Sequence, residues 1–160
     1  MKLVVATRAM LESLKRDRDA FAELVGSPIP DGWPEFPEAI DFTIATLTEA
    51  PHDADWWMHL FVVDGRLVGS GGFVGPPTDG AVEIGYEIAP EFRGRGFATD
   101  AARAMIDKAR AAGGVHVVLA HTLPSDNPST SVLRHLEFRL VGEVADDEEG
   151  TVWRWERAIT

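Results

Sequence analysis

The spacing of hydrophobic and polar positions predicts an alternation of short strands and amphipathic helices. In the first third of the chain, apolar residues recur at helical spacing over 11–25, behind Thr7, a residue type that caps helix N-termini. A short apolar strand at 3–6 precedes this helix. A break rich in glycine and proline follows at 26–37, and a second helix is predicted over 38–49.

The rest of the chain contains runs that are typical of strands, because they are apolar or alternate with a period of two. These runs are 57–63, 66–74, 81–89, 115–122, 138–145 and 151–158. Asp64-Gly65 joins the first two as a hairpin turn that tolerates positive φ. One helix is predicted after residue 97 and another over 127–136. These elements predict an α/β (α+β) fold built on about six to seven strands and about four helices.

The most informative segment is the loop that connects strand 81–89 to the alanine-rich helix. Its residues are Arg93, Gly94, Arg95, Gly96, Phe97, Ala98 and Thr99. The first turn of a helix has backbone N–H groups without intrahelical partners, at the positive end of the helix dipole. Glycines let a ligand approach the backbone, and the arginines add charge-assisted donors. The loop therefore predicts a cradle for a diphosphate, although a plain flexible turn would look similar.

Other phosphate-binding motifs fit this chain poorly. A Walker loop requires a lysine, and lysine is absent from 66 to 107. A dinucleotide-binding fingerprint requires an acid at the end of the next strand, where this chain has His121 and Thr122. The net charge of -11 and the pI near 4.8 argue against nucleic acid as a partner.

Composition favours one compact domain over residues 1–160. No apolar run is long enough to cross a membrane, and the apolar stretch at 3–6 is too short for a signal segment. We therefore expect a cytoplasmic protein without a membrane partner. The absence of cysteine excludes disulfides, thiolate zinc sites and a cysteine acyl-enzyme. The five histidines show no metal-ligand spacing, so no metal is expected.

The run from Glu83 to Thr99 resembles the acetyl-CoA motif of the GNAT N-acetyltransferases, whose signature is Arg/Gln-x-x-Gly-x-Gly/Ala. Arg93, Gly96 and Ala98 stand at its three positions. The run is most similar to the branch of ribosomal-protein N-terminal acetyltransferases, in which a Glu-Ile-Gly-Tyr strand precedes the loop. The resemblance implies the GNAT fold, with a mixed, mostly antiparallel sheet and two splayed parallel strands. It also implies transfer of acetyl from acetyl-CoA to a primary amine in a ternary complex.

The same resemblance implies how acetyl-CoA would be held. Strands 81–89 and 115–122 would be the splayed pair, with the pantetheine arm between them. Backbone groups at Ile88 and Ala89 would bind this arm, and one N–H there would stabilise an oxyanion. Loop 93–99 would hold the diphosphate.

A second family motif follows the next strand, where relatives carry Asn-x-x-Ser and a helix that ends in Leu-Gly-Phe. Counting back from Phe138 places Ser129 at the serine and Asp126 at the asparagine, with Glu137 in place of the glycine. Asn127 is an alternative for the asparagine. Capping of the next helix explains Asp126 or Asn127 equally well.

Candidate catalytic residues follow from the needs of amine acetylation, because a lysine-like amine is almost wholly protonated at neutral pH. Glu83 is the first candidate base and His121, at the end of the neighbouring strand, is the second. Leu133 occupies the place of the tyrosine that protonates the leaving thiolate in many relatives, so Ser129 is the candidate acid. Tyr86 is expected to pack in the core with its hydroxyl satisfied. Structural roles remain open for all three candidates.

The acceptor amine is the least determined part of the function. Segment 26–57, rich in proline, tryptophan and acids, is where family members build the acceptor wall, although its tryptophans also suit an ordinary core. The acceptor would be a protein N-terminus or a small amine. A non-catalytic acyl-CoA-binding sensor and a nucleotide-binding domain remain alternatives. The Trp-bearing final hairpin would suit a homodimer.

Overall fold

The computed structural model describes residues 1–159, and seven strands in that range form a sheet in the order β1-β2-β3-β4-β5-β7-β6. The strands are β1 Lys2–Val5, β2 Met58–Val63, β3 Arg66–Phe73, β4 Ala81–Ile88, β5 Val117–Thr122, β6 Arg139–Asp146 and β7 Gly150–Ala158. Every neighbouring pair is antiparallel except β4 and β5. The mixed, mostly antiparallel sheet is confirmed, and each strand lies within two residues of its predicted range.

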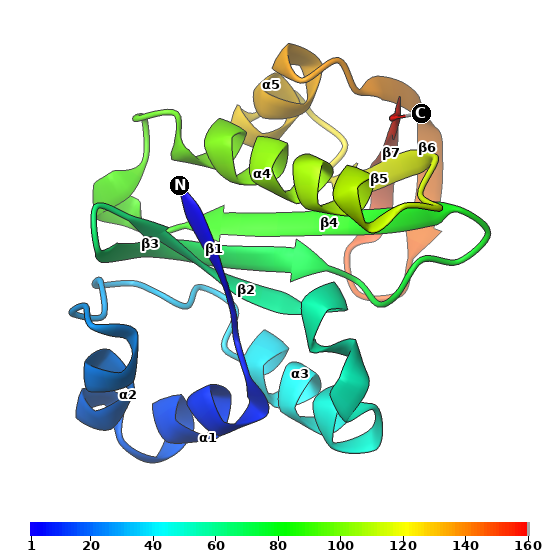
Figure 1. Ribbon diagram of the computed structural model, residues 1–160. Helices are drawn as coiled ribbons and strands as arrows, with labels where there is room; N and C mark the ends of the chain where they lie inside the picture. Colours follow the sequence, from blue (N-terminus) through cyan, green and yellow to red (C-terminus); the bar gives the residue numbers. More distant parts are fainter. Residues whose placement is uncertain (160) are drawn as a thin grey trace.

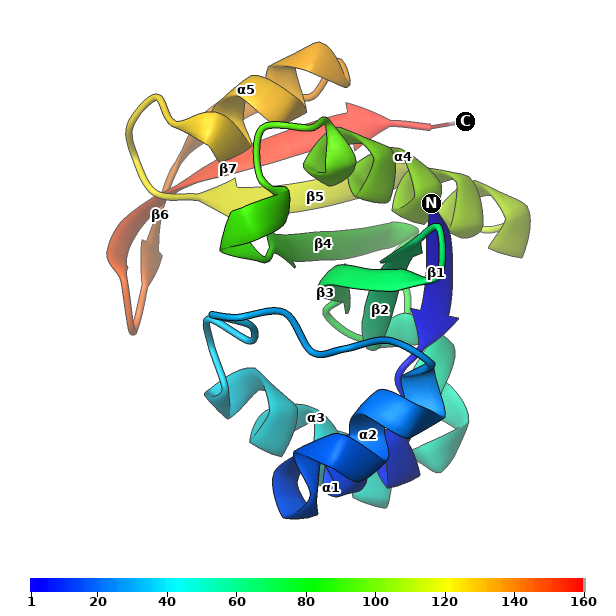
Figure 2. The ribbon, with the colours of Figure 1, turned by 90° about the vertical axis from the view of Figure 1, so that its left-hand side faces the viewer.

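Helices cover both faces of this sheet. They are α1 Arg8–Arg16, α2 Arg18–Val25, α3 Glu38–Glu49, α4 Phe97–Ala112 and α5 Pro128–His135, with 3-10 helices η1 Pro51–Trp56 and η2 Pro90–Phe92. Helices α1, α2 and α3 lie on one side of the sheet, and α4 and α5 lie on the other (Figures 1 and 2). None of the helices in residues 1–159 is long and apolar enough to cross a membrane.

The prediction of one helix over 11–25 is wrong, because the chain breaks at Asp17. Asp17 has an extended backbone (φ -153°), and its carboxylate accepts hydrogen bonds from the N–H groups of Asp19 and Ala20 at 3.1 and 3.2 Å. This residue therefore caps a second helix, which runs in a new direction. Leu24, expected on the buried face, is 61% exposed as a result. The cap at Thr7 is confirmed, since its Oγ1 accepts from the Met10 N–H at 3.2 Å.

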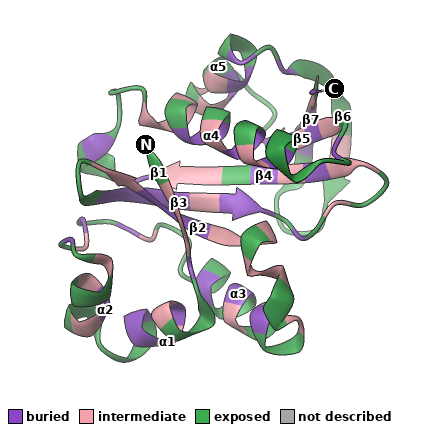
Figure 3. Ribbon diagram, viewed as in Figure 1, coloured by how far each residue is buried: buried purple, intermediate pink, exposed green. Residues whose placement is uncertain are grey.

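Helix α4 packs against β4 through small residues. Ala101, Ala102 and Ala109 are fully buried, as predicted from their helical spacing. Short side chains let the helix axis approach the sheet closely, and Met105 and Ile106 fill the remaining space. Figure 3 shows buried positions along the strands of the sheet and on the helices that cover them. This packing fixes the start of α4 relative to the end of β4.

The parallel strands β4 and β5 separate toward their carboxyl ends. They pair only from Ala81 to Glu83, opposite Val117 to Leu119. Beyond that point β4 continues to Ile88, and β5 to Thr122, without further pairing to each other. The expected splayed pair is confirmed, and residues 84–88 of β4 therefore present an unpaired backbone edge to a gap.

Glycines in β3 allow unusually close approach of its neighbours. A Cβ atom at Gly69 or Gly71 would overlap carbonyl groups of β4, and one at Gly72 would overlap the carbonyl of Trp57. Side chains are therefore excluded at these three positions of β3. Gly71, Gly72 and Gly85 leave part of the sheet surface without side chains, and a pocket lies over it.

Candidate active site

Loop 93–99 presents an open helix N-terminus. Gly94 and Gly96 have φ values of 75° and 82°, in the left-handed region that favours glycine. Gly96 is the N-cap of α4, and no side chain caps this helix. A Cβ atom at either glycine would meet no heavy atom within 4 Å, so the space in front of the loop is open. The first N–H groups of a 16-residue helix therefore point into a site that fits a diphosphate.

The two arginines of this loop have different surroundings. The Nε atom of Arg93 donates to the Ile88 carbonyl at 2.9 Å, and its Nη2 lies 3.4 Å from Oε2 of Glu35. Arg93 thus braces the end of β4 and the segment before α3. The guanidinium of exposed Arg95 stacks over the Phe92 ring, 5.5 Å from its centroid. Arg95 is consequently better placed than Arg93 to contact an anion.

Ile88 and Ala89 direct their backbone groups to opposite edges of β4. The N–H of Ala89 donates to the Val68 carbonyl, beside β3, at 2.8 Å. Because successive residues of a strand alternate their hydrogen-bonding direction, the N–H of Ile88 points the other way, toward the gap between β4 and β5. The Ala89 N–H is therefore already engaged, and Ile88 provides the N–H that faces the gap.

Glu83 and His121 form a pair at the point where β4 and β5 separate. His121 Nδ1 lies 3.0 Å from Glu83 Oε1, and the two side chains are 27% and 34% exposed. Glu83 pairs with Leu119 in the parallel register, and both side chains lie on the same face of the sheet. His121, two residues after Leu119, also lies on that face. With a proton on Nδ1 directed at the carboxylate, Nε2 is left as an acceptor. The structure thus unites the two alternative candidates.

The residues predicted for the second family motif, Asp126, Asn127 and Ser129, lie at the start of α5 and have different contacts. Asn127 caps α5, accepting from the Thr130 N–H at 3.0 Å and donating its own N–H to Thr130 Oγ1 at 2.9 Å. Asp126 forms an ion pair of 2.8 Å with Arg134. Asn127 is therefore the cap of α5, as the capping interpretation predicted, whereas Asp126 forms an exposed ion pair and does not cap the helix. Ser129, in the first turn, is half-buried.

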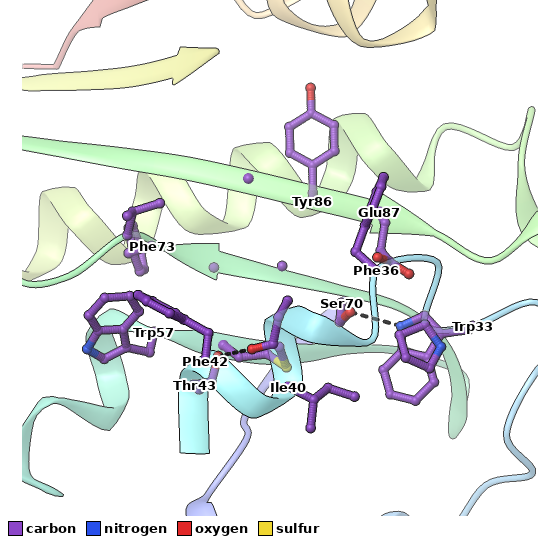
Figure 4. Close-up of a pocket in the computed structure, with 17 residues that line it drawn as sticks. Trp33, Phe36, Ile40, Phe42, Thr43, Trp57, Ser70, Phe73, Tyr86 and Glu87 are labelled. Atoms are coloured by element: carbon purple, nitrogen blue, oxygen red, sulfur yellow. Dashed lines mark hydrogen bonds between the residues drawn. The ribbon is translucent and has the colours of Figure 1, made fainter. Parts of the chain in front are cut away.

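Tyr86 is the residue at this site that sequence reasoning did not assign to function. Burial raises the pKa of its hydroxyl to about 12, partly offset by a hydrogen bond with Ser129. In Figure 4, Tyr86 extends to the side of β4 opposite the aromatic residues that line the pocket. The expectation of a satisfied hydroxyl therefore holds, but its partner is the candidate acid. Only the tertiary placement of α5, which packs against α4, brings these two hydroxyls together.

A pocket of about 380 Å³ lies on the α3 side of the sheet, and from β4 it is lined by Gly85, Tyr86 and Glu87. Its aromatic and apolar walls come from the segment before α3, from α3 itself and from the start of β2, and its floor is the bare area of β3 and β4. The lining residues are Trp33, Pro34, Phe36, Ala39, Ile40, Phe42, Thr43, Trp57, Met58, Ser70, Gly71, Gly72, Phe73, Val74, Gly85, Tyr86 and Glu87.

Segment 26–57 contributes to this pocket differently from what its composition suggested. Trp33 is buried, stacks on Phe21 with 6.0 Å between ring centroids, and donates from Nε1 to Ser70 Oγ at 2.8 Å. It is both core and pocket wall. The acids of the segment do not line the pocket; within residues 1–159 its one carboxylate is Glu87, on β4. Burial raises the pKa of Glu87, and its Oε1 accepts from the Glu35 N–H at 2.8 Å.

Comparison with known proteins identifies the family. The family model of the acetyltransferase (GNAT) domain matches residues 8–139. The chain therefore belongs to the GNAT acetyltransferase family, and the resemblance of loop 93–99 is confirmed. An uncharacterized N-acetyltransferase p20 of Bacillus licheniformis is 30% identical over 85 residues, which are 52% of this chain and 48% of that protein. The chain thus matches about half the length of this curated relative.

Solved structures share the fold at low sequence identity. A spermidine N-acetyltransferase chimera from Vibrio cholerae and hSSAT superposes with a TM-score of 0.73 at 16% identity, covering 99% of this chain and 96% of that one. An acetyltransferase from Salmonella typhimurium that modifies the N-terminal serine of ribosomal protein L7/L12 gives 0.69 at 19% identity, covering 99% and 94%. A ribosomal L7/L12 α-N-protein acetyltransferase in complex with coenzyme A also gives 0.69 at 19% identity, covering 98% and 93%. These structures establish the GNAT fold for this chain.

Proposed function

We propose that this chain is an acetyl-CoA-dependent N-acetyltransferase that acetylates a primary amine by direct transfer in a ternary complex. The observation that carries the proposal is the position of the Glu83–His121 pair. It lies where β4 and β5 separate, and the next residues of β4 toward loop 93–99 line the apolar pocket. This arrangement supports a cofactor site, a proton acceptor and an acceptor pocket along the same strand.

Acetyl-CoA would supply an activated acetyl group as a thioester. Its diphosphate would be held by the first N–H groups of α4, with Gly94 and Gly96 leaving room for it and Arg95 adding charge. The N–H of Ile88 would stabilise the negative charge that develops on the carbonyl oxygen. Arg93 would act by keeping the end of β4 in position.

The Glu83–His121 pair would accept the proton that the amine loses. A neutral His121 has its Nε2 available as an acceptor, and the carboxylate of Glu83 would stabilise the resulting imidazolium. On the other side of β4, Ser129 would protonate the leaving thiolate, with the Tyr86 hydroxyl as its hydrogen-bond partner. The acid and the base would then act from opposite sides of the reacting thioester.

The alternative of a non-catalytic sensor explains less of the site. A sensor requires the cradle at α4, but it does not require a hydrogen-bonded carboxylate and imidazole beside the splayed strands. The relatives named above act on spermidine and on an N-terminal serine. For this chain, a protein N-terminus or a small amine remains the proposed acceptor. The absence of a metal requirement, the cytoplasmic location and the homodimer remain predictions.

The proposal is tested by measuring acetyl-CoA binding by calorimetry and amine-dependent release of free thiol. Glu83→Gln and His121→Gln are expected to lower kcat by about 100-fold with unchanged acetyl-CoA binding, since general-base catalysis contributes on that scale. His135→Gln, at an exposed position of α5, is the matched control and should retain full turnover. Binding without thiol release for any amine would favour the sensor, and absence of binding would refute both.

A further inference from the structure

The pocket on the α3 side of the sheet is lined mainly by apolar and aromatic side chains. Aromatic rings from four parts of the chain line it, namely Phe36 before α3, Phe42 on α3, Trp57 before β2 and Phe73 at the end of β3. The rings of Phe42 and Trp57 pack edge to face with 5.8 Å between their centroids. Phe36 and Phe42 are 51% and 60% exposed. Large exposed rings beside glycine residues form a surface on which a bound apolar group would be stabilised, because it removes these rings from water.

Most polar side chains of the pocket are engaged within the protein, and the exception among the described residues is the indole N–H of Trp57, which is buried without a hydrogen-bond partner. Ser70 Oγ accepts from Trp33 Nε1 at 2.8 Å, and Thr43 Oγ1 donates to the Ala39 carbonyl at 2.7 Å. The Glu87 carboxylate accepts from the Glu35 N–H at 2.8 Å and thereby fixes the segment before α3 to β4. A ligand carrying several ammonium or hydroxyl groups would leave them without partners against these rings.

The lining residue of β4 that stands nearest to the Glu83–His121 pair on the same face is Gly85. Gly85 lies on the same face of β4 as Glu83, two residues along the strand, a separation of about 7 Å. A Cβ atom at Gly85 would meet no heavy atom within 4 Å, so the space above it is open. A ligand with its body over Gly85 and the aromatic wall would place one amino group at Glu83, where the charges are complementary.

We propose that the preferred acceptor is a small primary monoamine with an aromatic body, of the arylalkylamine class. This inference rests on the proposed acetyltransferase function. The volume of about 380 Å³ accommodates one such ring system with its short alkyl arm. In the reaction, the amine nitrogen bonds to the acetyl carbon and the carbon–sulfur bond breaks. The amine's proton passes to the Glu83–His121 pair, and the thiolate takes up a proton through Ser129, whose hydroxyl regains a proton from water.

The test compares kcat/KM for 2-phenylethylamine, spermidine, and two short peptides that begin with serine or phenylalanine. The expected result is a preference of about tenfold or more for 2-phenylethylamine over each of the other three, equivalent to about 1.4 kcal/mol. Preference for spermidine or for the serine peptide would overturn the inference. Preference for the phenylalanine peptide would assign the pocket to a protein N-terminus and would overturn it too.

Two variants test the pocket itself. Gly85→Leu fills the space above the floor and is expected to raise KM for 2-phenylethylamine about tenfold, while calorimetry shows acetyl-CoA binding unchanged. Phe42→Ser changes an exposed rim residue, so folding is preserved, and it should lower kcat/KM for this amine about fivefold by removing apolar contact. Leu24→Ser, at an equally exposed position of α2 outside the pocket, is the control and should have no effect.

Failure of this inference is distinguishable from failure of the proposed function. If spermidine is acetylated and 2-phenylethylamine is not, the acetyltransferase function stands and only the acceptor class is wrong. An unchanged kcat/KM in Phe42→Ser would likewise refute the pocket assignment alone. If acetyl-CoA is not bound, or no amine releases thiol, both proposals are refuted.

Discussion

His59 provides a quantitative test of the packing between α4 and the sheet. Its side chain is fully buried, with Nδ1 3.0 Å from the Trp57 carbonyl and Nε2 2.7 Å from Lys108 Nζ. Lys108 also contacts Asp55 at 2.7 Å. The carbonyl requires a proton on Nδ1, and the ammonium of Lys108 requires a lone pair on Nε2. The site therefore accommodates only the neutral imidazole.

The consequence is a loss of stability at acidic pH. Burial, with a further effect of the Lys108 charge, lowers the pKa of His59 to about 4 from the usual 6.5. A histidine with a lowered pKa in the folded state contributes stability that is complete above pH 6.5 and is lost as the pH falls toward 4. At 1.36 kcal/mol per pKa unit, the loss is about 2 kcal/mol at pH 5 and about 3 kcal/mol at pH 4.

The assay is urea unfolding of the wild type and of His59→Gln from pH 7.5 down to pH 4. His59→Gln cannot gain the proton, so its deficit in unfolding free energy should shrink by about 2 kcal/mol by pH 5. Exposed His52→Gln is the control, and its difference from the wild type should stay constant. Glu87, whose raised pKa acts in the opposite direction, is unchanged in every variant and cancels. A deficit for His59→Gln that does not vary with pH would refute the reasoning.

Four further substitutions, at three positions, test the cradle and the two ends of α5. Gly96→Glu should weaken acetyl-CoA binding about 100-fold or more, because it places bulk and negative charge before α4. Gly96→Ala should carry only the backbone cost of about 1 kcal/mol. Equal affinities of the two variants for acetyl-CoA, measured by calorimetry, would exclude the cradle. Asn127→Ala should lower the unfolding free energy by about 1 kcal/mol through loss of the α5 cap, and an unchanged urea midpoint would contradict that role. Glu137→Gly should raise the unfolding free energy by up to about 1 kcal/mol, because Glu137 has a φ of 65° that glycine adopts more readily. A lower midpoint of thermal unfolding in this variant would contradict the prediction.

The departures from the family pattern become intelligible in the structure. Glu137 stands where relatives carry glycine, and its left-handed backbone shows why glycine suits that position. Leu133 replaces the family tyrosine and is buried in the core. Tyr86 brings a phenol to Ser129 from β4 instead. The alternation along β4 predicted that Tyr86 and Glu83 lie on opposite faces of the strand. It could not predict the contact between Tyr86 and Ser129, because Ser129 lies on α5, about 40 residues further along the chain.

The sequence by itself determined the strands, the register of buried positions on α4, and the loop at Gly94 and Gly96. These features depend on short-range physics: side-chain periodicity, capping, and the freedom of glycine at positive φ. The break at Asp17 is also local, yet the continuous apolar spacing on either side concealed it. A local sequence pattern predicts secondary structure reliably where it is compatible with only one backbone conformation.

Only the tertiary structure decided how the candidate residues combine. It paired Glu83 with His121, placed Ser129 beside Tyr86, and built an apolar pocket whose carboxylate comes from β4 and not from the acidic segment before it. Each of these contacts joins residues that are distant in sequence, and the packing of helices against the splayed sheet sets their distances. Periodicity fixes which face a side chain occupies, whereas its partners depend on which elements pack against that face.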